Sequence, residues 1–249
     1  MNGIFPRLVR ILALVFIMGA GPVFGQSGAG VDFSLDLGEG GDGDISVAIQ
    51  LVILMTLLSL APAIVLLMTS FLRIIIVLGF LRNALGLQTV PPNQVLVGMA
   101  LFLSFFLMMP VGTRIYEEAM VPLQEGVITG SEALDRASDP LAEFMLKQTR
   151  PGDIEFFLEV SGQGAVTVEE LPMQVLIPAF ILSELRTAFQ IGFLIFLPFL
   201  IIDFVVATVL MAMGMIMMPP VIVSLPFKVL LFVLVDGWYL IVRSLVLSF

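Results

Sequence analysis

The feature that most limits the fold is a long apolar stretch from Thr187 to Phe227, in which Asp203 is the only formal charge. A second stretch, from Ile45 to Leu72, has no formal charge. Each is longer than the roughly 20 residues that a helix needs to cross the hydrocarbon core of a bilayer. With 59% hydrophobic and 12% charged residues, the chain has too little polar surface to cover its apolar side chains in water. We therefore expect an all-α integral membrane protein, built of helical hairpins with four membrane-length hydrophobic segments.

Histidine and cysteine are both absent from the sequence. Their absence excludes histidine acid–base catalysis, cysteine nucleophiles and disulfides, and it excludes nearly all zinc, iron–sulfur and haem sites. The net charge of −9 also argues against nucleic acid as a partner, because phosphates attract basic surfaces. We predict no catalytic residue, no metal ligand and no cofactor.

Residues 1–25 have the pattern of a secretory signal peptide, with Arg7 and Arg10 before an apolar core and small residues at the cleavage site. The apolar core is too short to cross a bilayer comfortably. We therefore favour cleavage before Gln26 over an additional membrane helix. Residues 26–44 are rich in glycine and acidic residues and hold no basic residue, so we expect an acidic, Gly-rich linker.

The remaining chain divides into two hydrophobic hairpins, residues 45–112 and 172–249, around a more polar stretch. In the second hairpin, a helix over residues 187–218 would be about 48 Å long at about 1.5 Å per residue. The hydrocarbon core is only about 30 Å thick. Such a helix must tilt, break near Pro198 or lie partly inside protein.

Residues 113–171 differ from both hairpins, since twelve acidic residues face four basic ones. We expect an amphipathic helical module here. Asp139–Pro140 predicts a helix start, with Asp at the N-cap and Pro at the first helical position. Glu143 and Lys147 are four residues apart, which places them on one face of that helix.

Basic residues in short loops mark the cytoplasmic side of a membrane protein. Arg73 and Arg82 flank a short stretch without acidic residues, which we assign to a cytoplasmic loop, and Lys228 fits a second cytoplasmic corner. The linker and the module of residues 113–171 would then lie outside the cytoplasm.

Charged residues inside the apolar stretches are candidate structural sites, because an unpaired charge at the centre of a membrane helix costs about 2.5–3.5 kcal/mol. Glu184 and Arg186 are two residues apart, so they point to different helix faces and should each meet another helix or another subunit. For Asp203 we favour a structural pair with a cationic residue over a proton relay. Asp236 should cap a helix end or pair with Arg243.

Three stretches carry motifs that identify a family. Residues 178–193 read PAFILSELRTAFQIGF, residues 226–238 read PFKVLLFVLVDGW, and residues 68–94 run from MTSFLR to PPNQ. These stretches resemble signatures of the FliP family, and the resemblance covers residues 45–249. The family has a flagellar branch and a virulence branch. The signal peptide and the acidic linker favour the flagellar branch, and a virulence type III secretion homologue is the alternative.

The resemblance implies a core channel-forming subunit of the flagellar type III protein export gate, which passes unfolded flagellar proteins across the inner membrane. It also implies about five copies that, with FliQ-like and FliR-like subunits, form a helical, channel-forming cone, which works together with FlhA and FlhB in the flagellar basal body. A small-solute transporter would usually show an inverted repeat, which is not visible here. An intramembrane enzyme would need a second carboxylate or another reactive group in an apolar stretch, so we expect no enzyme.

Methionines crowd the end of the long apolar stretch, around Gly214, at positions 211, 213, 215, 217 and 218. On a helix, residues two apart diverge by about 200°, so alternate methionines form no single stripe. An irregular loop hinged at Gly214 could turn several toward one axis, although methionine also serves as hydrophobic filler. The resemblance implies a methionine-rich gasket around a pore, and we assign the pore gasket to Met215, Met217 and Met218.

Overall fold

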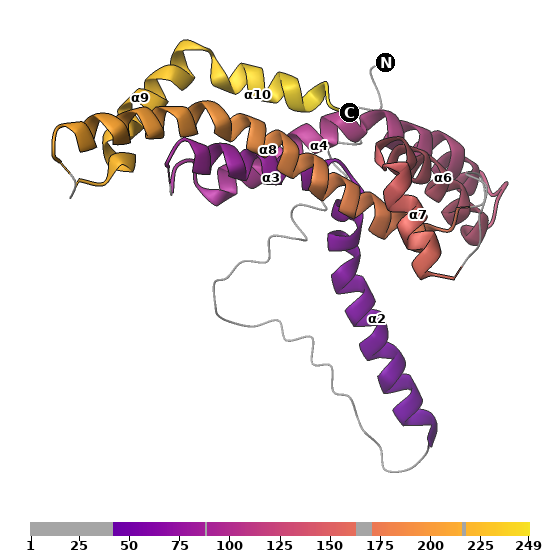
Figure 1. Cartoon of the computed structure of the whole chain (residues 1–249). Coiled ribbons are helices and arrows are strands. Elements are labelled where there is room, and N and C mark those ends of the chain that lie inside the picture. Colours follow the sequence, from indigo (N-terminus) through magenta and orange to yellow (C-terminus); the bar gives the residue numbers. More distant parts are fainter. Residues whose placement is uncertain (1–41, 88, 163–170, 216–217) are drawn as a thin grey trace, which may run out of the picture. The chain divides into compact units, whose positions relative to one another are not determined.

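The computed structural model describes residues 42–87, 89–162, 171–215 and 218–249 (Figure 1). The predicted signal peptide and the linker up to residue 41 lie outside the described residues. Within the described ranges every regular element is a helix and no strand occurs, which confirms the all-α expectation. The chain divides into two compact units, residues 1–52 and 53–249. Of the first unit the structure describes only the start of a helix, so the packing described below is that of the second.

Ten helical elements follow one another along the described chain, and one of them is a single π-helical turn. In order they are α2 (Asp42–Leu67), α3 (Phe71–Ala84), α4 (Asn93–Ile115), η1 (Tyr116–Met120), α5 (Val121–Gln124), α6 (Gly130–Gln148), α7 (Pro151–Val160), α8 (Met173–Ala212), α9 (Pro220–Leu234) and α10 (Gly237–Val246). Because α2 begins at Asp42, residues 42–44 are helical and do not belong to the expected linker.

Two helices are long and apolar enough to cross a membrane, residues 93–124 and α8. Two further pairs, α2 with α3 and α9 with α10, pass the same criterion only if each bent pair counts as one span. The axes of α9 and α10 differ by 64°. The described chain therefore has between two and four membrane-length segments, and the expected four are reached only with both bent pairs.

Helix α8 has 40 residues and continues without a break through Pro178 and Pro198. At about 1.5 Å per residue it is about 60 Å long, twice the thickness of the hydrocarbon core. Of the three alternatives, the break near Pro198 is not found, which leaves a tilt or a helix that lies partly inside protein. A proline removes one hydrogen bond from the helix, but the adjacent Phe199 is buried in a cluster with Leu81 and Phe232, and this packing holds α8 in place beside the proline.

The core of the second unit lies where α3 packs along α8. Ile74, Val77 and Leu78 of α3 are fully buried and contact side chains from the three helices around them, namely Leu96 and Ala100 of α4, Ala188 of α8 and Leu245 of α10. The two helices approach closely at Gly192, where a Cβ atom would lie 2.5 Å from Cδ2 of Phe80. A side chain at this position would push α3 and α8 apart.

The polar module begins without a break after the preceding span, because η1 and α5 continue directly from α4. The expected helix start at Asp139–Pro140 is wrong, since α6 runs through both residues. Its start is a capping box, in which Thr129 and Glu132 each accept a hydrogen bond from the other's backbone N–H. This signal lies ten residues upstream of Asp139 and outweighs the preference of Pro140 for a first turn. Residues 163–170 of the module are outside the described chain.

None of the three basic residues used to predict the orientation lies in a loop. Arg73 and Arg82 lie in α3 and Lys228 lies in α9, and the side chains of Arg73 and Lys228 are buried. A buried, paired charge does not follow the rule for loop charges. The expected cytoplasmic loop between Arg73 and Arg82 is therefore wrong, and the placement of residues 113–171 outside the cytoplasm stays a prediction.

Candidate functional site

The corner between α8 and α9 begins at a glycine that ends α8. Gly214 has a φ of 75°, in the left-handed region that glycine adopts without strain. Its N–H donates to the carbonyl oxygen of Met211 at 3.0 Å, and the N–H of Met215 donates to that of Leu210 at 2.9 Å. These two bonds are a Schellman motif, which closes the last turn of the helix and turns the chain away from its axis.

The methionines of this corner are exposed in the single chain. Met211 and Met213 lie on either side of the end of α8, while Met215 and Met218 lie in the turn before α9. Met217, the third residue assigned to the pore gasket, is outside the described residues. The structure thus places Met215 and Met218 in one irregular segment, where the period of a helix does not separate their side chains.

An ion pair joins α8 to α9 below this corner. The Lys228 ammonium donates to Oδ2 of Asp203 at 2.6 Å and to the carbonyl oxygen of Ala84, at the end of α3, at 3.2 Å. The Ser224 hydroxyl donates to the other carboxylate oxygen of Asp203. The Lys228 side chain is 2% exposed and that of Asp203 is 26% exposed, so the carboxylate reaches the surface of the single chain and the ammonium does not.

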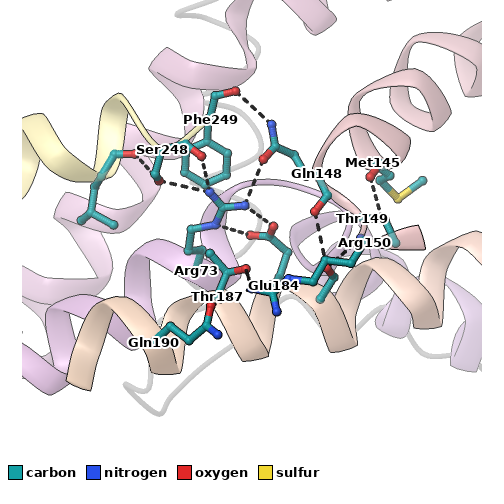
Figure 2. A network of polar contacts seen from close by, with 12 residues as sticks. Arg73, Met145, Gln148, Thr149, Arg150, Glu184, Thr187, Gln190, Ser248 and Phe249 are labelled. Carbon is teal, nitrogen blue, oxygen red and sulfur yellow. Dashed lines mark hydrogen bonds and ion pairs between the residues drawn. The ribbon is translucent and has the colours of Figure 1, made fainter. Parts of the chain in front are cut away.

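A second ion pair lies between α3 and α8 and is fully buried (Figure 2). Arg73 donates from Nε to Oε2 of Glu184 at 2.8 Å and from Nη2 to Oε1, and the two side chains are 2% and 0% exposed. The same guanidinium donates to Oε1 of Gln148 at 3.0 Å and to the carbonyl oxygen of Ser248 at 2.7 Å. The ring of Phe249 covers the face of the guanidinium, with 3.8 Å between the ring centroid and Cζ of Arg73. Arg73 therefore connects α3, α6, α8 and the residues after α10.

Arg186 has a different partner from Glu184. Its guanidinium pairs with Asp153 of α7 at 3.1 Å, and Arg150, the residue before α7, donates to Oε1 of Gln190 on α8 at 2.6 Å. Glu184 and Arg186 therefore contact α3 and α7, respectively, within the same chain. Together these contacts hold the polar module against the first half of α8.

Asp236 occupies the N-cap position of α10, but its side chain makes no capping hydrogen bond. Among the described residues it forms no ion pair with Arg243 either, so both contacts expected for this residue are wrong. The reason is the backbone. Asp236 has φ 51° and ψ 54°, in the left-handed region, whereas a capping residue has extended angles that direct its side chain to the helix N–H groups.

An exposed charge network connects α4 with α6. Glu143 accepts a hydrogen bond from Lys147, one turn further along α6, at 2.6 Å and another from Arg114 of α4. These two bonds, that from Lys147 first, lower the pKa of Glu143 from 4.5 to about 2. No group of three His, Cys, Asp or Glu side chains that could hold a metal ion occurs in the part of the chain that the structure describes.

Sequence reasoning singled out Glu184 but missed the residues that surround it in the fully buried network, namely Arg73, Gln148, Ser248 and Phe249. One signal was available for Arg73, because apolar residues continue on both sides of it and a loop residue would not be flanked in this way. The contribution of Gln148, Ser248 and Phe249 carries no sequence signal, since it depends on contacts between residues 75 to 175 positions apart.

These observations define a class. The chain is a helical membrane protein whose charged residues inside the apolar helices are used in internal pairs, while its apolar surface is mostly uncovered. Only 11% of the most apolar window of α8 is buried. Such a surface must be covered by lipid or by other subunits.

Comparison with known proteins gives the family. The sequence model of the FliP family matches residues 54–245. The chain is 54% identical over 207 residues to the flagellar biosynthetic protein FliP of Bacillus subtilis (strain 168), covering 83% of this chain and 94% of the relative. It is 55% identical over 205 residues to that of Pectobacterium carotovorum subsp. carotovorum, covering 82% and 80%. It is 47% identical over 249 residues to that of Cereibacter sphaeroides, covering 98% and 82%. The chain belongs to the FliP family.

Proposed function

We propose that the chain is a core channel-forming subunit of the flagellar type III protein export gate and that unfolded flagellar proteins pass through it across the inner membrane. The observation that carries this proposal is the corner between α8 and α9. There a long apolar helix ends at Gly214, and exposed methionines follow in an irregular turn that no other part of the described chain covers.

The gate would depend on the flexible, apolar side chains of these methionines. Met215, Met217 and Met218, repeated over about five copies around an axis, would form an apolar ring. A narrow apolar ring excludes water and therefore blocks ions. Unbranched thioether side chains can rearrange around a polypeptide of any sequence and close again behind it. The corner needs no reactive group for this role, in keeping with a structural rather than an enzymatic function.

The Asp203–Lys228 pair supports this function by holding the base of the corner. Asp203 lies nine residues before the end of α8, and Lys228 lies eight residues after the start of α9. The ion pair therefore limits how far the two helices can separate, while the turn above it stays free to move. Glu184 and Arg186 have the same kind of structural role at the other half of α8, and Asp236 lies at the bend between α9 and α10.

The partners would be further copies of the chain, FliQ-like and FliR-like subunits, and FlhA and FlhB, in the inner membrane at the flagellar basal body. The uncovered surface of α8 supports this assembly. It carries large exposed side chains along its length, including Phe189, Phe193, Leu200, Phe204 and Val209. Burial of apolar area at about 25 cal/mol per Å² would drive such helices together wherever lipid does not solvate them.

The test replaces Met215, Met217 and Met218 together by Ala. We expect the complex to assemble as before, because the side chains of Met215 and Met218 are exposed and belong to no core cluster, and we expect the membrane to leak small ions. Ion permeability of cells that produce the complex measures this. A matched control is Met120→Ala, which removes an equally exposed methionine from η1. Unchanged permeability in an assembled triple variant would show that the corner is packing and not a gate.

A further inference from the structure

The last segment of the chain is attached to the rest of the unit at one buried apolar side chain and at its final two residues. We call residues 237–249, which comprise α10 and the three residues after it, the arm. Along α10 the side chains of Trp238, Tyr239 and Leu240 are exposed, and Leu245 is the one large side chain that is fully buried. Leu245 lies in the core cluster with α3, α4 and α8, and Ile241 packs at its edge. A ten-residue helix with one buried anchor needs a second attachment to stay in place.

The second attachment is at the end of the arm, where Ser248 and Phe249 close over Arg73. We call these two residues the latch. Ser248 accepts hydrogen bonds from Nη1 of Arg73 at its carbonyl oxygen and, at 3.1 Å, at its hydroxyl. The carbonyl oxygen of Phe249 accepts from Nε2 of Gln148 at 2.9 Å, and its ring lies over the guanidinium (Figure 2). The ring of Phe249 also stacks with that of Phe144.

The start of the arm has the features of a pivot. Asp236 is the only described residue other than glycine with a positive φ, and its side chain makes no capping bond. The following Gly237 packs so closely on Phe232 that a Cβ would lie 2.2 Å from the ring. Trp238 also packs edge-on against the ring of Phe232, with 5.5 Å between the ring centroids. The bend is thus held mainly by contacts with Phe232, and a change in the two dihedral angles of Asp236 would swing α10 as one piece about this point.

The latch and the buried ion pair depend on each other. While the latch is closed, the N–H groups of Arg73 have partners in Glu184, Gln148 and Ser248, and the Phe249 ring excludes water from its face. If the arm moves away, Nη1 loses both of its acceptors and the face of the guanidinium is uncovered. Glu184 and Gln148 still accept from Nε and Nη2, but a buried N–H group without an acceptor is costly, so Nη1 must be reached by water. Opening of the arm and hydration of the Arg73–Glu184 pair are therefore one event.

We propose that Ser248 and Phe249 are a latch that closes the arm over the Arg73–Glu184 pair, and that the arm opens by releasing this latch and turning about Asp236. The latch also connects the arm to Gln148 at the end of α6, so opening uncouples the α9–α10 segment from the polar module. This inference concerns the single chain and does not depend on protein export.

Cysteine labelling of the full chain in membranes tests the proposal, because the protein has no cysteine of its own. The Leu245→Cys variant places a thiol on the buried face of the arm, where a maleimide reagent reacts only after the arm has opened. Adding Phe249→Ala should raise the labelling rate by about tenfold or more, since it removes the cation–π contact and the cover of the guanidinium. Adding Leu247→Ala, the matched control in the same segment, removes an exposed side chain and should change the rate less than about twofold.

A second reporter separates opening of the arm from loosening of the whole fold. Ala179→Cys lies fully buried on α8, away from the arm, and its labelling rate should stay the same when Phe249→Ala is added. Equal acceleration at both reporters, or no acceleration at Leu245→Cys, would overturn the latch. If Leu245→Cys disturbs folding, hydrogen exchange of the α10 amides in the Phe249→Ala chain gives the same information without a reporter. Unchanged exchange would overturn it too.

Discussion

Helix α8 carries two paired carboxylates, one fully buried and one partly exposed, and their surroundings differ. Glu184 is fully buried and pairs with Arg73, which donates to both of its carboxylate oxygens. The other N–H groups of Arg73 donate to the neutral acceptors Gln148 and Ser248. Asp203 is 26% exposed and faces a lysine, with one serine hydroxyl as its other partner. The first pair connects four parts of the chain, while the second joins the two helices of one corner and the end of α3.

The difference follows from the chemistry of the two cations. The planar guanidinium of Arg73 has five N–H donors and an apolar face, so it can organise several segments around one point. The ammonium of Lys228 is a compact charge with three donors, and its acceptors are Asp203 and the carbonyl oxygen of Ala84. We infer that the Arg73–Glu184 pair determines whether the unit folds and that the Asp203–Lys228 pair determines the geometry of the corner.

The largest effect is expected for Glu184→Gln. The change leaves the Arg73 cation buried without a countercharge, which should lower the free energy of unfolding by about 3–5 kcal/mol. Thermal unfolding of the detergent-solubilised full chain measures it. The double variant Arg73→Met with Glu184→Leu should recover part of this loss, because no charge stays buried. If Glu184→Gln unfolds at the temperature of the unchanged chain, the pair does not hold the fold.

An intermediate effect is expected for Asp203→Asn. The amide keeps the contact with Ser224 but leaves the Lys228 ammonium without its countercharge, at a cost of about 1–3 kcal/mol. Assembly of the complex should suffer more than the pH dependence of export, and both can be measured on the same cells. Normal assembly together with loss of the dependence of export on the proton gradient would identify Asp203 as a proton relay instead.

The smallest effect is expected at the exposed network of Glu143, which is the solvent-exposed counterpart of both buried pairs. Its pKa is lowered to about 2, so the folded state binds this proton less readily than the unfolded state, whose pKa is near 4.5. The stabilisation is therefore present above pH 4.5 and is lost as the pH falls through about 2. Thermal unfolding from pH 6 to pH 2 should show the unchanged chain slightly more stable than Glu143→Gln at the upper end, with the difference vanishing at the lower end. A constant difference would contradict this.

The sequence was sufficient for the helical class and the family, because apolar length and short motifs are local properties. It did not give the bounds of the long helices, since the helix considered over residues 187–218 is α8, Met173–Ala212. It was insufficient for Pro140 and Pro198, where a local preference for a helix start or break met competing signals. At Pro140 the stronger signal was a capping box about ten residues away, and at Pro198 it was the burial of Phe199. Neither the capping box nor the burial of Phe199 can be predicted by examining the proline and its immediate neighbours alone.

The charged residues show the same limit more clearly. The sequence indicated that Glu184 and Asp203 need partners, since a buried charge is costly unless paired. It did not indicate which partners, because Arg73 and Lys228 were assigned to loops by a rule that applies to exposed charges. For Arg73 the decisive contact joins residues 111 positions apart. Only the folded chain brings them together.

The continuity of α8 has a mechanical consequence. From Glu184 to Ala212 the helix runs unbroken for about 42 Å, at about 1.5 Å per residue. A stiff rod of this length is a lever with its fulcrum at the buried arginine, and a rotation of about 5° there displaces the far end by about 4 Å. That displacement is comparable to the spacing between neighbouring backbones in a protein. Small rearrangements beside the polar module would thus reach the methionine corner enlarged, without any change of secondary structure in between.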